Sequence, residues 1–186
     1  MTAPGAPRRI DRRRRDRIIK GALDVIADHG IEGLTHRRVA SAASVPVGAT
    51  TYYFSSLEDL LAAAMADLVE RDVAGLRERF EDIPAGGSLA AALAEIVVDA
   101  TGPGRRNSVV VVELHAAALR RESLRQLAVA WEESWRRLLA PRVGELAAGT
   151  VSAAVAWLIN GALLEEREVV PSDAEAVLRH VLHEPG

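Results

Sequence analysis

The 186-residue sequence contains no cysteine, which excludes both a disulfide framework and a thiolate metal site. Aromatic side chains make up only 4% of the chain, so the position of each one is informative. The longest apolar stretches are broken by Glu95, Glu113 and Asn160 and fall short of the ~20 residues that a membrane span needs. No apolar segment follows the N-terminal arginines. We therefore expect no signal peptide, no membrane partner and a cytoplasmic location.

Motifs of common catalytic sites are also missing. The sequence holds no G-x-S-x-G, no P-loop and no G-x-G-x-x-G, and the G-P-G at 102–104 predicts only a turn. Its five histidines form no H-E-x-x-H, and we interpret His180 and His183 as C-terminal surface groups rather than metal ligands. We expect a protein that is not an enzyme and that holds no metal and no cofactor.

The charges are distributed unevenly along the chain. Residues 1–54 carry ten basic and five acidic side chains, a net charge of +5, whereas the remainder carries −8. A basic segment joined to an acidic body indicates that the basic segment meets a polyanion.

Residues 35–54, T-H-R-R-V-A-S-A-A-S-V-P-V-G-A-T-T-Y-Y-F, predict two short helices joined by a tight turn. Thr35 is a suitable N-cap, and Pro46 suits the point where the second helix opens. This second helix, about 47–53, carries small or polar groups and then aromatics, so it cannot bury much of itself. It is a candidate for insertion into a groove, as in a helix-turn-helix.

Helical periodicity covers most of the rest of the chain. Residues 1–9 contain Pro and Gly without a pattern, which indicates a disordered arm. The run at 109–112 is compatible with a strand, but we predict a helix because no partner strand is present. The sequence therefore predicts an all-α fold: a three-helix head, a long helix, and an all-helical body. Besides 47–53, we expect helices at about 11–29, 35–43, 56–83, 88–100, 107–121, 122–139, 150–166 and from 171.

The stretch from Ala43 to Leu61, A-S-V-P-V-G-A-T-T-Y-Y-F-S-S-L-E-D-L-L, resembles the N-terminal pattern of the tetracycline-repressor-like (TetR) family of bacterial transcription regulators. The preceding G-x-x-x-L-T-x-x-x-V-A at 30–40 matches too, so the resemblance covers about residues 12–65. Three positions depart from the pattern: Ser44 replaces a glycine, Thr51 a tyrosine and Leu57 a lysine. The last two are positions that commonly contact the DNA backbone in the family. The residues that fall on the pattern are Gly48, Tyr53, Phe54, Ser56, Glu58, Leu60 and Leu61.

The resemblance implies a DNA-binding domain at 10–55. An isolated run of arginines suits a solvated, disordered tail, but this run directly precedes the helix-turn-helix, so we expect phosphate contacts. Small apolar groups can meet a thymine methyl, and a threonine hydroxyl can donate or accept. Arg38 is a candidate for either a base or a phosphate. The expected phosphate contacts are Arg12, Arg13, Arg14, Arg15, Thr35, Arg37, Thr51 and Tyr52, and the expected base-reading positions are Arg38, Val47, Ala49 and Thr50. Gly48 is a further expected DNA-binding residue.

A TetR-like body at 56–186 also implies a small-molecule pocket and a dimer interface. The expected pocket residues are Glu113, His115, Trp131, Trp135 and Asn160. Trp131 and Trp135 also suit a plain core stripe, and Asn160 suits a hydrogen bond across a dimer interface. The last two helices carry more apolar surface than one core needs, as in a four-helix interface. The expected interface residues are Val155, Leu158, Ile159, Ala162, Val177, Leu178, Val181 and Leu182.

These patterns predict a homodimeric regulator that reads a palindromic double-stranded DNA operator and acts as a repressor released by a small molecule. Two recognition helices would lie ~34 Å or more apart. The alternative is an all-helical small-molecule-binding protein or enzyme whose head does not bind DNA. The departures at Thr51 and Leu57 are its support.

Overall fold

The computed structural model describes residues 11–84 and 86–183, and every regular element in these ranges is helical. The all-α prediction is therefore confirmed. The arm predicted at residues 1–9 lies outside the described residues. The chain forms two compact units, residues 1–64 and 65–186, and the division falls inside the long helix α4, Leu57–Glu81.

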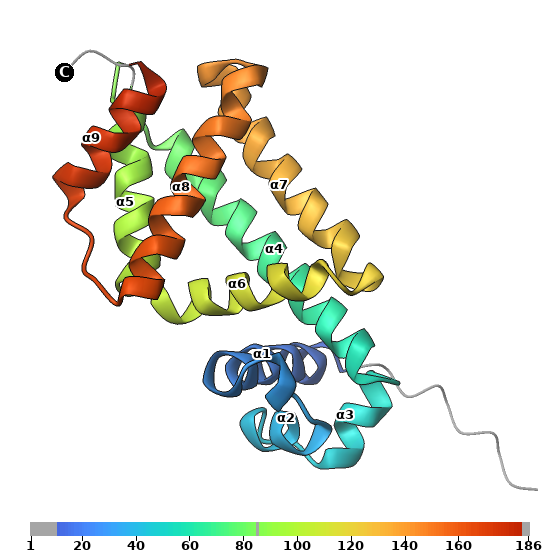
Figure 1. The fold of residues 1–186 in the computed structure, drawn as a ribbon. Helices are drawn as coiled ribbons and strands as arrows, with labels where there is room; N and C mark the ends of the chain where they lie inside the picture. The colour runs from blue at the N-terminus through green and yellow to red at the C-terminus, as the bar shows by residue number, and fades with distance from the viewer. Residues whose placement is uncertain (1–10, 85, 184–186) are drawn as a thin grey trace, which may run out of the picture. The chain divides into compact units, whose positions relative to one another are not determined.

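The first unit is a three-helix head completed by the start of α4 (Figure 1). Asp11 caps its first helix by accepting from Arg14 N at 3.3 Å, and Gly30 ends that helix with a φ of 65°. Phe54 and Leu60 are buried with the apolar faces of these helices. The elements are α1 Arg12–His29, a 3-10 turn Ile31–Gly33, α2 His36–Ala42 and α3 Val47–Tyr53.

A glycine allows α1 to approach the end of α2 closely. A Cβ built on Gly21 would lie 2.9 Å from the backbone nitrogen of Ala43, which is closer than real Cβ contacts. Gly21 is therefore required for the packing that supports the helix-turn-helix.

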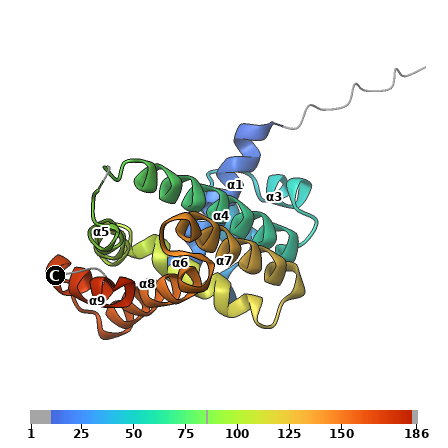
Figure 2. The same cartoon turned by 90° about the horizontal axis from the view of Figure 1, so that it is seen from above.

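The second unit is a helical body in which α8 lies beside α7, α5 and α9. Figure 1 shows α6 running transverse to α7 and α8, and Figure 2 shows α8 and α9 side by side from above. Leu93, Leu139, Val151 and Leu178 are fully buried in its core. The helices are α5 Leu89–Thr101, α6 Arg105–Ala118, α7 Glu122–Val143, α8 Glu145–Glu165 and α9 Pro171–Leu182.

Two predicted helix ends were wrong. α7 continues through Pro141 to Val143, because a proline in the last turn removes little of the helical hydrogen bonding. Gly144, with a φ of 83°, then donates to Ala140 O at 2.8 Å and reverses the chain, so α8 begins at Glu145 instead of 150. The ambiguous run at 109–112 lies within α6, as predicted.

Among the described residues, α8 alone is long and apolar enough to cross a membrane by length and composition. Core helices meet the same two criteria. Only 28% of its most apolar stretch is buried within the single chain, so α8 presents an apolar face that this chain does not cover.

Candidate DNA-binding head and ligand cavity

The turn between α2 and α3 keeps a glycine-type geometry although it contains a serine. Val45 N donates to Ala40 O at 2.9 Å and Ser44 N donates to Ser41 O at 3.2 Å, which is the bonding of a Schellman motif. Ser44 takes the left-handed conformation with a φ of 53°. The departure at Ser44 therefore leaves the helix-turn-helix geometry intact and places a side chain where glycine is favoured.

Thr50 holds α3 against α2 and does not face outward. Its side chain is fully buried, and its hydroxyl donates to Val47 O at 2.7 Å and lies 3.1 Å from His36 Nδ1. Thr50 is four residues before the buried Phe54, on the same face of the helix. The expectation that Thr50 reads a base was therefore wrong.

The outer face of α3 consists of small, apolar and aromatic groups. Val47 is 47% exposed and Tyr52 is 60% exposed, and Thr51 is also exposed. A Cβ on Gly48 would meet nothing within 4 Å, so the backbone itself is accessible there. Ala49 is partly exposed. No residue of α3 carries a formal charge, so its contacts are limited to hydrogen bonds, apolar contacts and aromatic contacts.

The arginines of the head differ in what they contact. Arg12, Arg13 and Arg14 are exposed on the first turn of α1, whereas the Arg15 guanidinium lies 5.3 Å from the centre of the Phe54 ring. Arg38 donates to Gly33 O at 2.8 Å.

Thr35 precedes α2 and caps it by accepting from the backbone nitrogen of Arg38 at 3.2 Å. Arg37, in the first turn of α2, is exposed. The basic side chains of the described head that show no such intramolecular contact are Arg12, Arg13, Arg17, Lys20 and Arg37, all of them exposed.

The second unit contains a cavity of about 460 Å³. Four of the five predicted pocket residues, His115, Trp131, Trp135 and Asn160, line it. Glu113 does not, because the residues of α6 that line the cavity lie at 107, 108, 111, 112, 115 and 116, on one side of the helix that does not include position 113. The expectation for Glu113 was wrong.

Sequence reasoning missed the acidic residue that α4 contributes to this cavity. Asp72 lines it from α4, together with Leu76. It lies four residues after the buried Leu68 and four residues before the buried Leu76. A carboxylate that interrupts an apolar helical stripe was the signal that could have identified it. The other missed polar lining residues are Asn107, Ser108, Glu132 and Ser152.

Three buried polar atoms with no hydrogen-bond partner in the described part of the chain all belong to this cavity: Asp72 Oδ2, His115 Nε2 and Trp131 Nε1. Because Val111 O can only accept, His115 Nδ1, at 3.0 Å, is the donor in that contact. In the neutral ring His115 Nε2 is therefore an acceptor, and Glu132 Oε1 at 3.7 Å is too far for a hydrogen bond.

The environment of Asp72 disfavours its charged form. Burial raises the pKa of this carboxyl above its ordinary value, while the indole N–H groups of Trp131 and Trp135, together with the charges of Arg79 and His115, offset part of the rise. The indole of Trp131 is close enough to affect the pKa, yet neither Trp131 Nε1 nor Asp72 Oδ2 completes a hydrogen bond.

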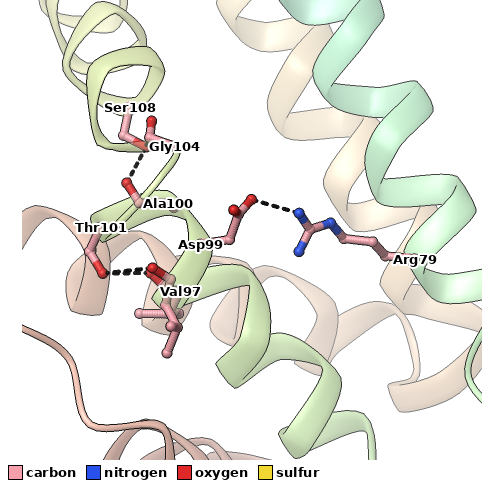
Figure 3. A network of polar contacts seen from close by, with 8 residues as sticks. Arg79, Val97, Asp99, Ala100, Thr101, Gly104 and Ser108 are labelled. Atoms are coloured by element: carbon pink, nitrogen blue, oxygen red, sulfur yellow. Dashed lines mark hydrogen bonds and ion pairs between the residues drawn. The ribbon is translucent and has the colours of Figure 1, made fainter.

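Polar contacts hold the α5–α6 corner beside the cavity (Figure 3). Ser108 Oγ donates to Ala100 O at 2.7 Å, so its hydroxyl proton is already used. Arg79 of α4 donates to Asp99 of α5 at 2.6 Å. Figure 3 shows these two side chains reaching toward one another from the two helices.

The predicted dimer surface needs correction. Val155, Leu158, Ala162 and Leu178 are buried in the core of their own chain, because they lie on the faces of α8 and α9 that pack inside the second unit. Ile159, Val181 and Leu182 are partly buried against the same core, and Val177 is 40% exposed. The uncovered apolar face of α8 instead includes Ala153, Ala156, Trp157 and Leu164.

Comparisons with known proteins agree with this geometry. A family profile described as "Bacterial regulatory proteins, tetR family" matches residues 18–64. A crystal structure of the multidrug binding protein EbrR complexed with imidazole is 35% identical, with a TM-score of 0.77 over 93% of this chain and 97% of EbrR. The HTH-type transcriptional regulator PksA of Bacillus subtilis is 38% identical over 78 residues, 41% of this chain, and the alignment spans only 36% of PksA.

A solved member of the TetR family from Streptomyces coelicolor A3, SCO1917, is 35% identical to the chain. The match has a TM-score of 0.79 and covers 90% of this chain and 97% of SCO1917. The chain therefore belongs to the TetR family of bacterial DNA-binding transcriptional regulators, which are not enzymes.

Proposed function

We propose that this regulator is a cytoplasmic, homodimeric repressor that leaves a palindromic operator when a small organic molecule enters the cavity of about 460 Å³. The observation that carries the proposal is the gathering of Asp72 Oδ2, His115 Nε2 and Trp131 Nε1, all buried and unpartnered, on one mostly apolar cavity. Such a cavity suits a ligand with a few polar groups. EbrR, a similar protein, is a multidrug binding protein solved with proflavin and with ethidium, which supports a small-molecule ligand here.

The helix α4 supplies the connection between ligand and DNA in this proposal. Its first turns bury Leu60 and Leu61, which belong to the first unit, and its later turns place Asp72 and Leu76 on the cavity of the second unit. A ligand that moves the cavity segment of α4 therefore acts on a helix whose first turns belong to the head. The two helix-turn-helix units would then change their spacing and lose the operator.

The apolar face of α8 supports the dimer. Trp157 is 67% exposed and Leu164 is 85% exposed, and they lie on the same side of the helix as Ala153 and Asn160. A second copy related by two-fold symmetry would cover this face and the exposed Val177 of α9. It would also pair two recognition helices with a palindrome.

A gel-shift assay with DNA from upstream of the protein's own gene tests the proposal. We expect a salt-sensitive complex that ethidium dissociates. Ser152→Phe, which fills the cavity, should keep DNA binding and abolish release, whereas Gln126→Phe, exposed on α7, should behave as the wild type. Absence of a salt-sensitive complex with every operator tested would support the alternative of a head that does not bind DNA.

A further inference from the structure

Apart from His115, the ionisable side chains that line the cavity are acidic. Asp72 and Glu132 are among the lining residues, and no lysine or arginine of the described chain is among them. The two carboxylates differ in position: Glu132 has a side chain 65% exposed, whereas Asp72 Oδ2 is buried. The cavity therefore contains an acidic group in its interior and no permanent positive charge on its wall. Both features disfavour the binding of an anionic ligand.

The arginine that could neutralise Asp72 from within the protein contacts another residue. Arg79 lies seven residues after Asp72, two turns along α4, and its charge lowers the pKa of Asp72. Its guanidinium, however, donates to Asp99 at 2.6 Å (Figure 3). Asp72 is thus left with a buried oxygen that no described residue satisfies. A buried carboxylate in this situation is stabilised strongly by an incoming cation.

The polar atoms that face the cavity favour a ligand that donates hydrogen bonds. Asp72 Oδ2 and, in the neutral ring, His115 Nε2 are acceptors, whereas Trp131 Nε1 is the one donor among the three unpartnered atoms. A ligand with N–H groups would satisfy both acceptors. A carboxylic acid ligand would meet two acceptors and one donor, which is the poorer match.

The aromatic walls suit the same ligand. Trp131 and Trp135 line the cavity from α7, and the His115 ring lies 4.5 Å from the Trp131 ring, centre to centre. Indole faces attract cations, and the attraction strengthens where water is excluded. A flat ring system with a delocalised positive charge would use the rings and the carboxylate together.

We propose that the cavity selects organic cations that carry N–H donors, and that Asp72 is the residue that determines this specificity. This inference rests on the proposed function for the location of the ligand, but not for its effect on DNA. A wider hollow of about 710 Å³ that includes Ile83, Arg142 and His183 offers no competing site. None of the three buried unpartnered atoms lines it, and Arg142 gives it a positive charge.

The test compares two probes of the same three-ring shape, both with two amino groups. Proflavin is a cation at neutral pH, and 2,7-diaminoanthracene, which carries its amino groups at the corresponding positions, is neutral. Binding is measured without DNA, by calorimetry and by quenching of tryptophan fluorescence, on the whole protein. We expect the wild type to bind proflavin about tenfold or more tightly than the neutral probe, since hydrogen bonds to charged groups are the stronger ones.

Asp72→Asn removes the charge without changing the size of the side chain. It should reduce the preference for proflavin about tenfold and leave the affinity for the neutral probe unchanged. Glu78→Gln, at an exposed carboxylate of the same helix that does not line the cavity, is the control and should change the preference little. A thermal melt verifies that each variant is folded. The comparison of the two probes on the wild type tests the proposal even if a variant fails to fold.

Equal binding of both probes by the wild type would overturn the proposal, as would an unchanged preference in folded Asp72→Asn. Binding of neither probe would also count against it. The effect on DNA is scored separately in the gel-shift assay. If proflavin binds through Asp72 but does not release the operator, the cation specificity stands and the proposed release mechanism fails.

Discussion

His36 Nδ1 of α2 and Thr50 Oγ1 of α3 lie 3.1 Å apart and join the two helices of the helix-turn-helix. Because the Thr50 hydroxyl proton goes to Val47 O at 2.7 Å, the threonine oxygen must accept from His36, which assigns the proton to Nδ1. A buried residue in the middle of α3 thus joins this helix to α2.

Thr50→Val should therefore destabilise the head and weaken binding to all DNA sequences alike. The change keeps the shape of the side chain but leaves a partly buried His36 N–H unpaired, at a cost of about 1–3 kcal/mol. Urea denaturation measures the loss of stability, and gel shifts with the operator and with single-base variants measure preference. A changed order of preference among the variants would restore Thr50 as a base-reading residue.

Ser44→Gly should stabilise the protein by about 1 kcal/mol, because Ser44 holds a φ of 53° that costs a residue with a Cβ about that much. Thermal and urea unfolding measure the change. Ser41→Gly, three residues earlier inside α2, is the matched control and should destabilise by about 1 kcal/mol. Two changes of the same sign would show that the conformation at Ser44 carries no strain.

Arg12→Ala combined with Arg13→Ala should weaken binding to every sequence. Each phosphate contact contributes about 0.9 to the slope of log affinity against log salt, so the slope should fall by about 2. Affinities at four salt concentrations measure it. The pair Arg77→Ala and Arg120→Ala, at exposed positions of the second unit, should leave the slope unchanged. A wild-type slope in the head variant would mean that this turn does not contact phosphates.

The raised pKa of Asp72 predicts how stability depends on pH. The unfolded chain releases the proton near the ordinary value of 3.8, whereas the folded chain retains it to higher pH. Relative to Asp72→Asn, the wild type should therefore lose stability as pH rises from 3.8 through the folded pKa and remain level above it. Chemical denaturation of both proteins across this range measures the difference. The opposite trend would mean that the folded state favours the carboxylate.

The groups that set this dependence come from three helices: Arg79 on the same helix as Asp72, His115 on α6, and Trp131 and Trp135 on α7. Proflavin affinity should rise with pH over the same interval, because the cation pairs with the carboxylate that forms. Asp72→Asn should bind proflavin with no rise in that interval.

Trp157→Glu combined with Leu164→Glu should convert the proposed dimer to monomers, because it places charges on the apolar face of α8. Light scattering after size-exclusion chromatography gives the mass. Leu119→Glu is the control: this leucine is 79% exposed at the end of α6, and the change should leave the mass unaltered. A wild-type mass for the double variant would place the interface elsewhere.

Local signals in the sequence predicted the helical layout well. Thr35 accepts from a backbone N–H group as the predicted N-cap, and the helices predicted at 11–29 and 88–100 match α1 and α5 within one residue at each end. The failures have a common physical origin, namely that tertiary packing decides which face of a helix is covered. Thr50 is polar yet buried, whereas Trp157 is apolar yet exposed.

The residues of the cavity show the same contrast between what local sequence signals predict and what tertiary packing decides. Its tryptophans were found because aromatic side chains are rare in this chain, and Asn160 because it interrupts an apolar helix. Asp72 was not predicted as a cavity residue, because a single acidic residue in a long helix with many charged residues resembles a surface group. Leu68 and Leu76, one turn before and one turn after Asp72, are both buried. Only these two positions taken together indicate that the side of α4 that carries Asp72 faces the interior of the second unit.

The absence of formal charge on α3 has an evolutionary consequence. In the proposed complex with DNA, the arginines at the start of α1 and in α2 supply the attraction to the phosphates, so substitutions at Val47, Gly48 or Thr51 leave that attraction in place. Operator choice can then drift through neutral intermediates that still bind DNA, without a compensating change elsewhere. We therefore expect that changes on the outer face of this one seven-residue helix are sufficient to change the target genes of the regulator.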